Sequence, residues 1–232
     1  MARLWAHLYH AWDSGRNCID AQTTAIKNAD KVSYVGKMFL REVVQDYFLV
    51  SHIIPHCVRQ ESKAKHSHNA ATVIPNGISP SVCPENQPEN PDGTTPGLAR
   101  RFEPDTINLI AAKTSNLLKF QKTMGLNNDP DAIFLYWPSR LDEAQKGIEL
   151  LEDIAQQFVE EHGDVQIAVV GNSVGSSEHS DVMGRLAYNS GGKITYQGFQ
   201  DDLSLLGYAA ASDVFGASLY EPFGQIDVVG NL

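Results

Sequence analysis

Two basic side chains and one acidic side chain follow directly on segments that predict buried strands. Arg140 and Lys146 come after the apolar run at residues 132–137, and Glu221 comes after the run at residues 213–217. In an open α/β sheet, ligands bind at the edge formed by the carboxyl ends of the strands. A guanidinium can hold two phosphate oxygens and an ammonium adds a point charge, so Arg140 and Lys146 suit a phosphate group. A surface pair that balances the acidic residues between them explains the two cations equally well.

The segment Glu221-Pro-Phe-Gly224 predicts a sharp turn that opens a helix at about Gln225. Pro222 fixes its own φ angle and lacks an N–H donor, and Gly224 lets the backbone approach a ligand closely. The free N–H groups at the start of a helix favour phosphate. We therefore expect Glu221 beside an anion-binding helix start, although a solvated glutamate in an α/β loop is a common alternative.

A third turn begins at Gly171, after the apolar run at residues 165–171. It lacks the lysine of a P-loop and the three glycines of the dinucleotide fingerprint, which disfavours a Rossmann oxidoreductase. If the sheet is parallel, all three turns lie along one edge of it.

The segments that must position these residues alternate regularly between strand and helix. The sequence predicts strands at residues 132–137, 165–171, 193–196 and 213–217, with helices at 146–161, 182–188 and 203–211 between them. The first helix of this series should turn Ile148, Leu151, Ile154 and Phe158 inward. The strands are continuously apolar rather than alternating, which is typical of a parallel sheet covered on both faces. The fold class is therefore α/β with a Rossmann-like parallel sheet.

The first part of the chain predicts a smaller α/β unit. Helices are expected at residues 19–28 and 37–47, and a strand at 29–36. Residues 71–79 predict a three-residue apolar strand that ends in a Pro-Asn-Gly turn. The helical pattern weakens between residues 51 and 68, and Pro55 favours a loop there.

Residues 80–104 hold six prolines among polar residues, so we expect little burial and interpret them as a loop or inter-domain linker. A helix follows at residues 106–125, with Gly125 as its end and apolar positions at Ile107, Ile110, Leu117, Leu118 and Met124.

Composition limits the class of function. With 42% hydrophobic and 20% charged residues, the 232-residue chain fits a soluble globular protein of one or two domains. The net charge of −10 argues against a nucleic-acid partner, because phosphate backbones need a basic surface. Three widely spaced cysteines favour a reducing compartment, so we expect a cytoplasmic protein. The longest apolar runs are far short of the roughly 20 residues that cross a bilayer, so no membrane partner is expected.

Two groups of residues invite a metal hypothesis. His52, His56, Cys57, His66 and His68 cluster in the sequence, but the loop expected there argues against a zinc site. The segment Asp129-Pro-Asp131 precedes a strand and therefore lies at the wrong edge of the sheet, so a turn is the better interpretation.

Five segments, in this order within residues 19–232, resemble the bacterial glycogen synthase and plant starch synthase family, which comprises retaining glycosyltransferases with two Rossmann-like domains (the GT-B type). They are Pro75-Asn-Gly-Ile78, residues 112–126 (Ala-Lys-Thr-Ser-Asn-Leu-Leu-Lys-Phe-Gln-Lys-Thr-Met-Gly-Leu), Ser139-Arg-Leu-Asp-Glu-Ala-Gln-Lys-Gly147, Ala210-Ala-Ser-Asp213 and Glu221-Pro-Phe-Gly224. The resemblance implies transfer of glucose from ADP-glucose or UDP-glucose to the non-reducing end of an α-1,4-glucan, with retention. It implies no metal or other cofactor.

The resemblance also implies roles for the three charged residues. Arg140 and Lys146 would hold the diphosphate of the donor and stabilise the charge that develops on it, in place of the metal ion that other glycosyltransferases need. Glu221 would bind hydroxyl groups of the donor sugar and support an oxocarbenium-like transition state.

Further residues are implied in binding the donor. Backbone N–H groups at Gly224, Gln225 and Ile226 would cap the distal phosphate, and Phe199 would contact the nucleobase. The full set of substrate-binding residues is Gly171, Gly198, Phe199, Phe223, Gly224, Gln225 and Ile226.

The chain departs from the family pattern in places. One extra residue lies between Arg140 and Lys146, and Phe223 stands where a cysteine is common. The glycine-rich motif and catalytic histidine of the family's N-terminal domain cannot be placed. By resemblance, residues 1–79 correspond to the end of an N-terminal Rossmann domain, residues 80–104 to a linker and residues 105–232 to a donor-binding domain truncated at its C-terminus. The alternative hypotheses are a carbohydrate- or nucleotide-sugar-binding relative without catalysis, or an inactive fragment of the enzyme.

Overall fold

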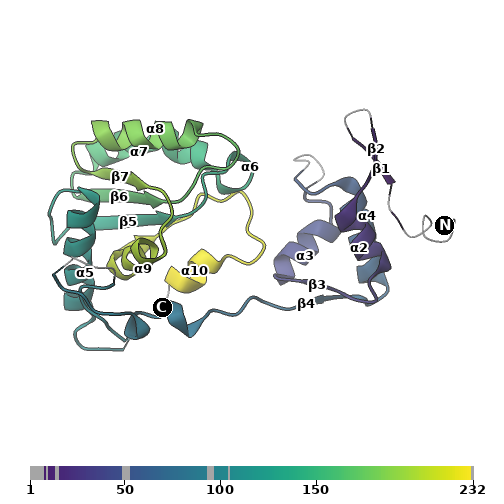
Figure 1. Cartoon of the computed structure of the whole chain (residues 1–232), viewed down its shortest axis with the longest axis horizontal. Helices are drawn as coiled ribbons and strands as arrows, with labels where there is room; N and C mark the ends of the chain where they lie inside the picture. The colour runs from purple at the N-terminus through teal and green to yellow at the C-terminus, as the bar shows by residue number, and fades with distance from the viewer. Residues whose placement is uncertain are drawn as a thin grey trace. The chain divides into compact units, whose positions relative to one another are not determined.

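The computed structural model describes residues 8, 10–13, 16–48, 53–92, 97–103 and 105–230 of the chain. The chain divides into two compact units, Met1–Gly77 and Ile78–Leu232 (Figure 1).

The described residues of the first unit form two small sheets and three helices. Strands β1 (His10–Asp13) and β2 (Arg16–Ile19) form an antiparallel hairpin that the sequence did not predict, and β3 (Val32–Tyr34) pairs in parallel with β4 (Ala71–Val73). The helices are α2 (Ala21–Asn28), α3 (Lys37–Val44) and α4 (His56–Ser67). The side chain of Asp20 begins α2 by accepting the N–H of Thr23 at 2.6 Å, as an N-cap residue does.

Helix α4 corrects the prediction of a loop between residues 51 and 68. Pro55 is the N-cap of α4, with φ −54°, and the helix begins at the next residue. Proline breaks a helix interior but is tolerated at its start, where its missing N–H would have no partner. Of the suspected metal cluster, His52 lies outside the described residues. Across the described ranges, no three His, Cys, Asp or Glu side chains are placed to hold a metal ion together.

The second unit is built on a parallel sheet, which confirms the predicted α/β class. Its strands are β5 (Ile133–Pro138), β6 (Val165–Val170), β7 (Ile194–Gln197) and β8 (Asp213–Val214), in the order β7-β6-β5-β8. Every neighbouring pair is parallel. The carboxyl ends of the strands therefore share one edge, as the sequence analysis assumed.

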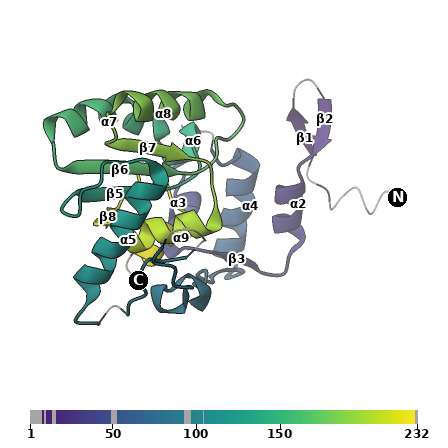
Figure 2. The same cartoon turned by 60° about the vertical axis from the view of Figure 1, so that its left-hand side comes forward.

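Helices cover both faces of this sheet (Figures 1 and 2). On one face lie α5 (Leu109–Met124) and α9 (Asp201–Ala210), and on the other lie α7 (Ile148–Glu161) and α8 (Glu178–Asn189). Side chains of β5 alternate between the two cores: Phe134 and Tyr136 join the first, and Leu135 and Trp137 join the second. The alternation follows from the period of two in a strand, with both faces buried.

The helix predicted at residues 146–161 is in fact two helices. A single turn, α6 (Glu143–Lys146), ends at Gly147, whose φ of +62° is left-handed, and α7 follows. The inward face of α7 was predicted correctly at Ile148 and Leu151, but Ile154 is 58% exposed.

Two further apolar positions were also predicted wrongly. Ile107, which precedes α5, and Ile110 in its first turn are 98% and 82% exposed. Gly125 does end this helix in a left-handed conformation, with φ +71°.

The proline-rich segment buries more than its composition suggests. It forms two short 3₁₀ turns, η1 (Pro80–Val82) and η2 (Pro84–Asn86), and its Leu98 and Phe102 are buried in the core beside α5. Side chains of α5 satisfy its backbone: Asn116 exchanges two hydrogen bonds with Arg100 at 2.9 and 3.0 Å, and the Lys119 ammonium donates to two of the segment's carbonyls. Such pairing is what allows an irregular backbone to be buried.

Across the ranges that the structure describes, every helix is too short or too polar to cross a membrane.

Candidate active site

The turns that follow β5, β6 and β7 meet at the carboxyl edge of the sheet. The backbone N–H of Leu141 donates to Asn172 at 3.0 Å, and Val174 donates back to Leu141 at 3.1 Å. Gly171 in turn donates to Gln197 at 3.0 Å. The predicted gathering of turns along one edge is therefore present.

Lys146 and Glu221, 75 residues apart in sequence, form an ion pair between the end of α6 and the turn after β8. The Lys146 side chain is 14% exposed and the Glu221 side chain 26% exposed. Partial burial strengthens such a pair, because the effective dielectric is lower than in water. The structure thus brings together two of the three charged residues singled out from the sequence.

Arg140 reaches the same turn through Gln145. Its Nη2 donates to Oε1 of Gln145 at 3.0 Å, and the residue is exposed. Gln145 is also the bridge to the turn before Glu221, since its carbonyl accepts the N–H of Leu219 at 2.7 Å and its amide donates to the carbonyl of Tyr220 at 3.4 Å. Gln145 was not predicted as a site residue, because a neutral amide in the turn before the predicted helix gave no signal.

The phenol of Tyr220 lies in this charged surrounding. Burial raises the pKa of Tyr220, the negative charges of Asp142 and Glu221 raise it further, and Arg140 acts in the opposite direction. The phenol therefore stays neutral at physiological pH and adds no charge to the site.

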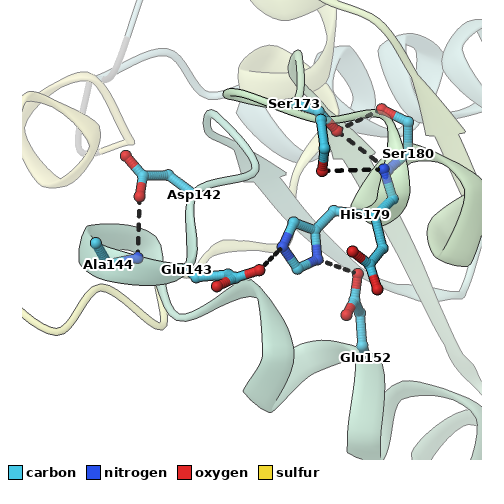
Figure 3. A network of polar contacts seen from close by, with 9 residues as sticks. Asp142, Glu143, Ala144, Glu152, Ser173, His179 and Ser180 are labelled. Atoms are coloured by element: carbon cyan, nitrogen blue, oxygen red, sulfur yellow. Dashed lines mark hydrogen bonds and ion pairs between the residues drawn. The ribbon is translucent and has the colours of Figure 1, made fainter.

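The single turn of α6 is shaped by its cap. Oδ1 of Asp142 accepts the N–H of Ala144 at 3.0 Å, and the carbonyl of Asp142 accepts the N–H of Lys146 at 2.8 Å (Figure 3). Gly147 then ends α6 with a left-handed φ. A larger residue does not fit there, because its Cβ would lie 2.3 Å from the carbonyl oxygen of Ala217. The cap and the glycine thus define both ends of α6, and its last residue, Lys146, contacts the turn after β8 through Glu221.

Gly171 has a packing role that the sequence did not reveal. A Cβ at this position would lie 1.7 Å from the carbonyl oxygen of Ser139, so only glycine lets the turns after β5 and β6 touch. Asn172, which was not predicted either, links three turns: its carbonyl holds Leu141, and its Oδ1 accepts the N–H of Phe199 at 3.1 Å. The Phe199 ring is 53% exposed.

The turn from Glu221 to Gly224 has the predicted form. Gly224 is buried with a left-handed φ of +77°, and α10 (Gln225–Gly230) begins at the predicted residue. Phe223 is partly buried, and the side chain of Ile226 packs into the core beneath α7 and α8.

Comparison with known proteins supports the fold. No protein-family model matches the chain. Among solved structures, the chain is similar to the catalytic domain of Starch Synthase IV from Arabidopsis thaliana bound to ADP and acarbose, with a TM-score of 0.68 and 18% sequence identity. This match covers 94% of the present chain. The chain has the fold of a GT-B glycosyltransferase.

Other solved structures match less well. HepE of Anabaena in complex with UDP has a TM-score of 0.49 and 18% identity over 91% of this chain, and a glycosyltransferase from Rickettsia africae ESF-5 has a TM-score of 0.43 and 17% identity over 86%. The chain spans 40% of the length of the Arabidopsis structure and 46% of each of the other two.

Within this GT-B fold, the predicted site residues all lie in the second unit, on the turns and helix ends that follow the four strands. Arg140 and Lys146 follow β5, and Glu221 follows β8. The predicted substrate-binding residues follow β6, β7 and β8: Gly171, Gly198, Phe199, Phe223, Gly224, Gln225 and Ile226. Hydrogen bonds of Gln145 connect Arg140 to the turn of Glu221, and Asn172 connects Phe199 to the turns after β5 and β6.

Proposed function

We propose that this chain carries the donor-binding site of a nucleotide-sugar-dependent glucosyltransferase that extends an α-1,4-glucan with retention, in the manner of a glycogen or starch synthase. The observation that carries the proposal is the ion pair between Lys146 and Glu221. An ammonium group, which suits a phosphate, thus lies beside a carboxylate, which suits sugar hydroxyls, at the carboxyl edge of a parallel sheet.

The basic residues are suited to the diphosphate of ADP-glucose or UDP-glucose. Arg140 is exposed and donates to the neutral amide of Gln145 rather than to a carboxylate in the part of the chain that the structure describes, so its guanidinium can turn to a phosphate at little cost. Lys146 already carries a carboxylate partner, and donor binding places additional negative charge near it. Fixed cations aimed at the charge that develops on the departing diphosphate are usually the largest catalytic term. In this proposal they act without a metal ion.

Glu221 acts at the sugar. Its partly buried carboxylate is held in place by Lys146, so it can accept hydrogen bonds from sugar hydroxyls without reorganising. The N–H groups of Gly224, Gln225 and Ile226 then cap the distal phosphate at the start of α10. The half-exposed ring of Phe199 offers a face for the nucleobase, where stacking contributes about 1–3 kcal/mol.

The test is the thermal stability of the chain with and without donor. At about 100 times its dissociation constant, ADP-glucose or UDP-glucose should stabilise the folded chain by about 2.7 kcal/mol and raise Tm by several degrees. Arg140→Ala should abolish the shift. Arg185→Ala removes the same charge from an exposed position on α8 and should keep it.

A donor that leaves the Tm unchanged at millimolar concentration would refute the proposal for this chain. The alternative of binding without catalysis is separated by transfer of radiolabelled glucose to an α-glucan, measured on the whole gene product. A rise in Tm with donor but without glucose transfer would favour a protein that binds the nucleotide sugar and does not catalyse transfer.

A further inference from the structure

A buried histidine contacts the one-turn helix that carries Lys146. His179, in the first turn of α8, is 5% exposed. Its Nε2 lies 2.8 Å from Oε1 of Glu143, the first residue of α6, and its Nδ1 lies 2.9 Å from Oε1 of Glu152 on α7 (Figure 3). One imidazole therefore joins three helices.

Both contacts can be hydrogen bonds only when the imidazole is protonated. Ionised carboxylates accept and do not donate, so each ring nitrogen must carry a proton. Burial alone would lower the pKa of His179, but the hydrogen bonds and charges of Glu152 and Glu143 outweigh burial and raise the pKa above its usual value. Strand β7 also packs against α8, and its Tyr196 hydroxyl bonds Ser180 at 2.9 Å rather than the histidine.

Helix α6 depends on such external contacts. A helix of one turn has almost no stability of its own, because nucleation costs more than a single turn returns. Besides the Asp142 cap, α6 is held by the Glu143–His179 pair at its start and by the bonds of Gln145 and Lys146 to the turn after β8.

We propose that His179 is a positioning residue for the donor site: through Glu143 it fixes α6, so that Lys146 is held toward Glu221 and the diphosphate. The inference rests on the proposed function for the role of Lys146, whereas the fixing of α6 by His179 stands on the contacts alone.

The two glutamates that contact His179 differ in their exposure to water, and this difference decides which contact breaks when the imidazole loses a proton. The Glu143 side chain is 59% exposed and the Glu152 side chain 12% exposed. When the imidazole loses a proton, its remaining N–H stays with Glu152, because an unpaired buried carboxylate costs more than a hydrated one. The bridge to α6 is the one that breaks.

The sign of the pH effect follows from the raised pKa. A histidine whose pKa is higher in the folded chain than in the unfolded chain stabilises the fold fully below about pH 6.5, and this contribution is lost as pH rises through the folded pKa. Helix α6 is thus most firmly held in mildly acidic solution and loosens as the solution becomes alkaline.

The decisive variant is Glu143→Ala, which removes the exposed partner and leaves the buried Glu152–His179 pair intact. Glu149→Ala, an exposed acidic residue in the first turn of α7, is the control with the same change of charge. His179→Phe serves as a second variant, because it keeps an aromatic ring but donates to neither carboxylate. Each is compared by amide hydrogen exchange at Lys146 and by affinity for ADP-glucose, whose diphosphate diester keeps its charge between about pH 5.5 and 8.5.

In the wild-type chain and in Glu149→Ala, protection of the Lys146 amide should fall as pH rises, after correction for intrinsic exchange. The affinity for ADP-glucose should weaken about three- to tenfold over the same range. In Glu143→Ala, protection and affinity should be low at every pH, with no slope.

Lys146 protection that is equal in Glu143→Ala and wild type, at every pH, overturns the proposal whether or not a nucleotide binds. If protection changes as expected but wild type binds neither ADP-glucose nor UDP-glucose, the proposed function fails and the fixing of α6 by His179 stands. If protection and binding occur but the affinities do not follow the protection, the role of His179 in the donor site is refuted.

Discussion

At the scale of single residues, the pairing of Lys146 with Glu221 has consequences for both partners. Each side chain is largely shielded from water, so each would be an uncompensated charge without the other. The pair therefore keeps the ammonium and the carboxylate fixed before any substrate arrives. Preorganisation of this kind is what makes electrostatic stabilisation effective, because the groups do not reorganise during the reaction.

Glu221→Gln should separate sugar chemistry from phosphate binding. The amide keeps the size of the side chain but loses the charge that, in the proposed function, supports an oxocarbenium-like transition state. We expect glucose transfer by the whole gene product to fall about 10²- to 10³-fold, the range seen when one stabilising group is removed. Affinity for ADP or UDP, measured by calorimetry, should change little. A variant that transfers glucose at the wild-type rate would exclude Glu221 from the reaction.

The residues predicted without the family resemblance share a recognisable property, which is a charge or a glycine after an apolar strand. Arg140, Lys146 and Glu221 were found in this way. Gln145 and Asn172 were not, because a neutral amide on a helix or a loop has no pattern that distinguishes it from a solvated side chain. The environment of His179 depends on two carboxylates from other helices, and no spacing in the sequence reports that.

At the scale of elements, the junction between α6 and α7 sets the position of Lys146. The sequence predicted one continuous helix because residues 146–161 have a sustained helical period. Gly147 interrupts it, with a left-handed φ and the carbonyl of Ala217 against its missing Cβ. A single glycine predicts a helix break only weakly from residue preferences. Here the contact with the Ala217 carbonyl determines that the helix breaks at Gly147.

Gly147→Ala should therefore be costly. A Cβ would meet the Ala217 carbonyl at 2.3 Å and would also have to occupy a left-handed backbone, so we expect a loss of about 2–4 kcal/mol in the free energy of unfolding. Gly184→Ala is the matched control, since Gly184 lies inside α8 with nothing within 4 Å of the added atom. It should stabilise the chain by about 0.5–1 kcal/mol. Urea denaturation measures both; similar values for the two variants would contradict the role given to Gly147.

Other elements show where local signals mislead. Pro55 was interpreted as a helix breaker and is a helix start, a distinction that depends on position within a turn rather than on residue type. The segment between residues 80 and 104 looked unable to bury itself, yet Asn116 and Lys119 of α5 supply the partners that its backbone needs. Composition does not reveal such long-range satisfaction of backbone groups.

At the scale of the whole molecule, the two cations of the candidate site belong to a strongly acidic chain. The chain carries a net charge of −10, whereas the candidate site presents Arg140 and Lys146. An anionic donor is therefore attracted only at short range, by groups at one edge of one sheet. Selection by a local cluster within an acidic protein also disfavours non-specific binding of nucleic acid, which requires an extended basic surface.

The location of the site within one unit leads to a final prediction. Every candidate residue belongs to the unit Ile78–Leu232, so donor binding should slow amide exchange there and specifically in the turns after β5, β7 and β8. Residues 16–48 of the other unit should exchange at the same rate with and without ADP-glucose, because binding protects the amides that it contacts or rigidifies. Exchange followed by mass spectrometry resolves both regions in one sample, and Arg140→Ala provides the baseline without binding. Protection confined to residues 16–48 would place the donor away from the Lys146–Glu221 pair and contradict the site itself.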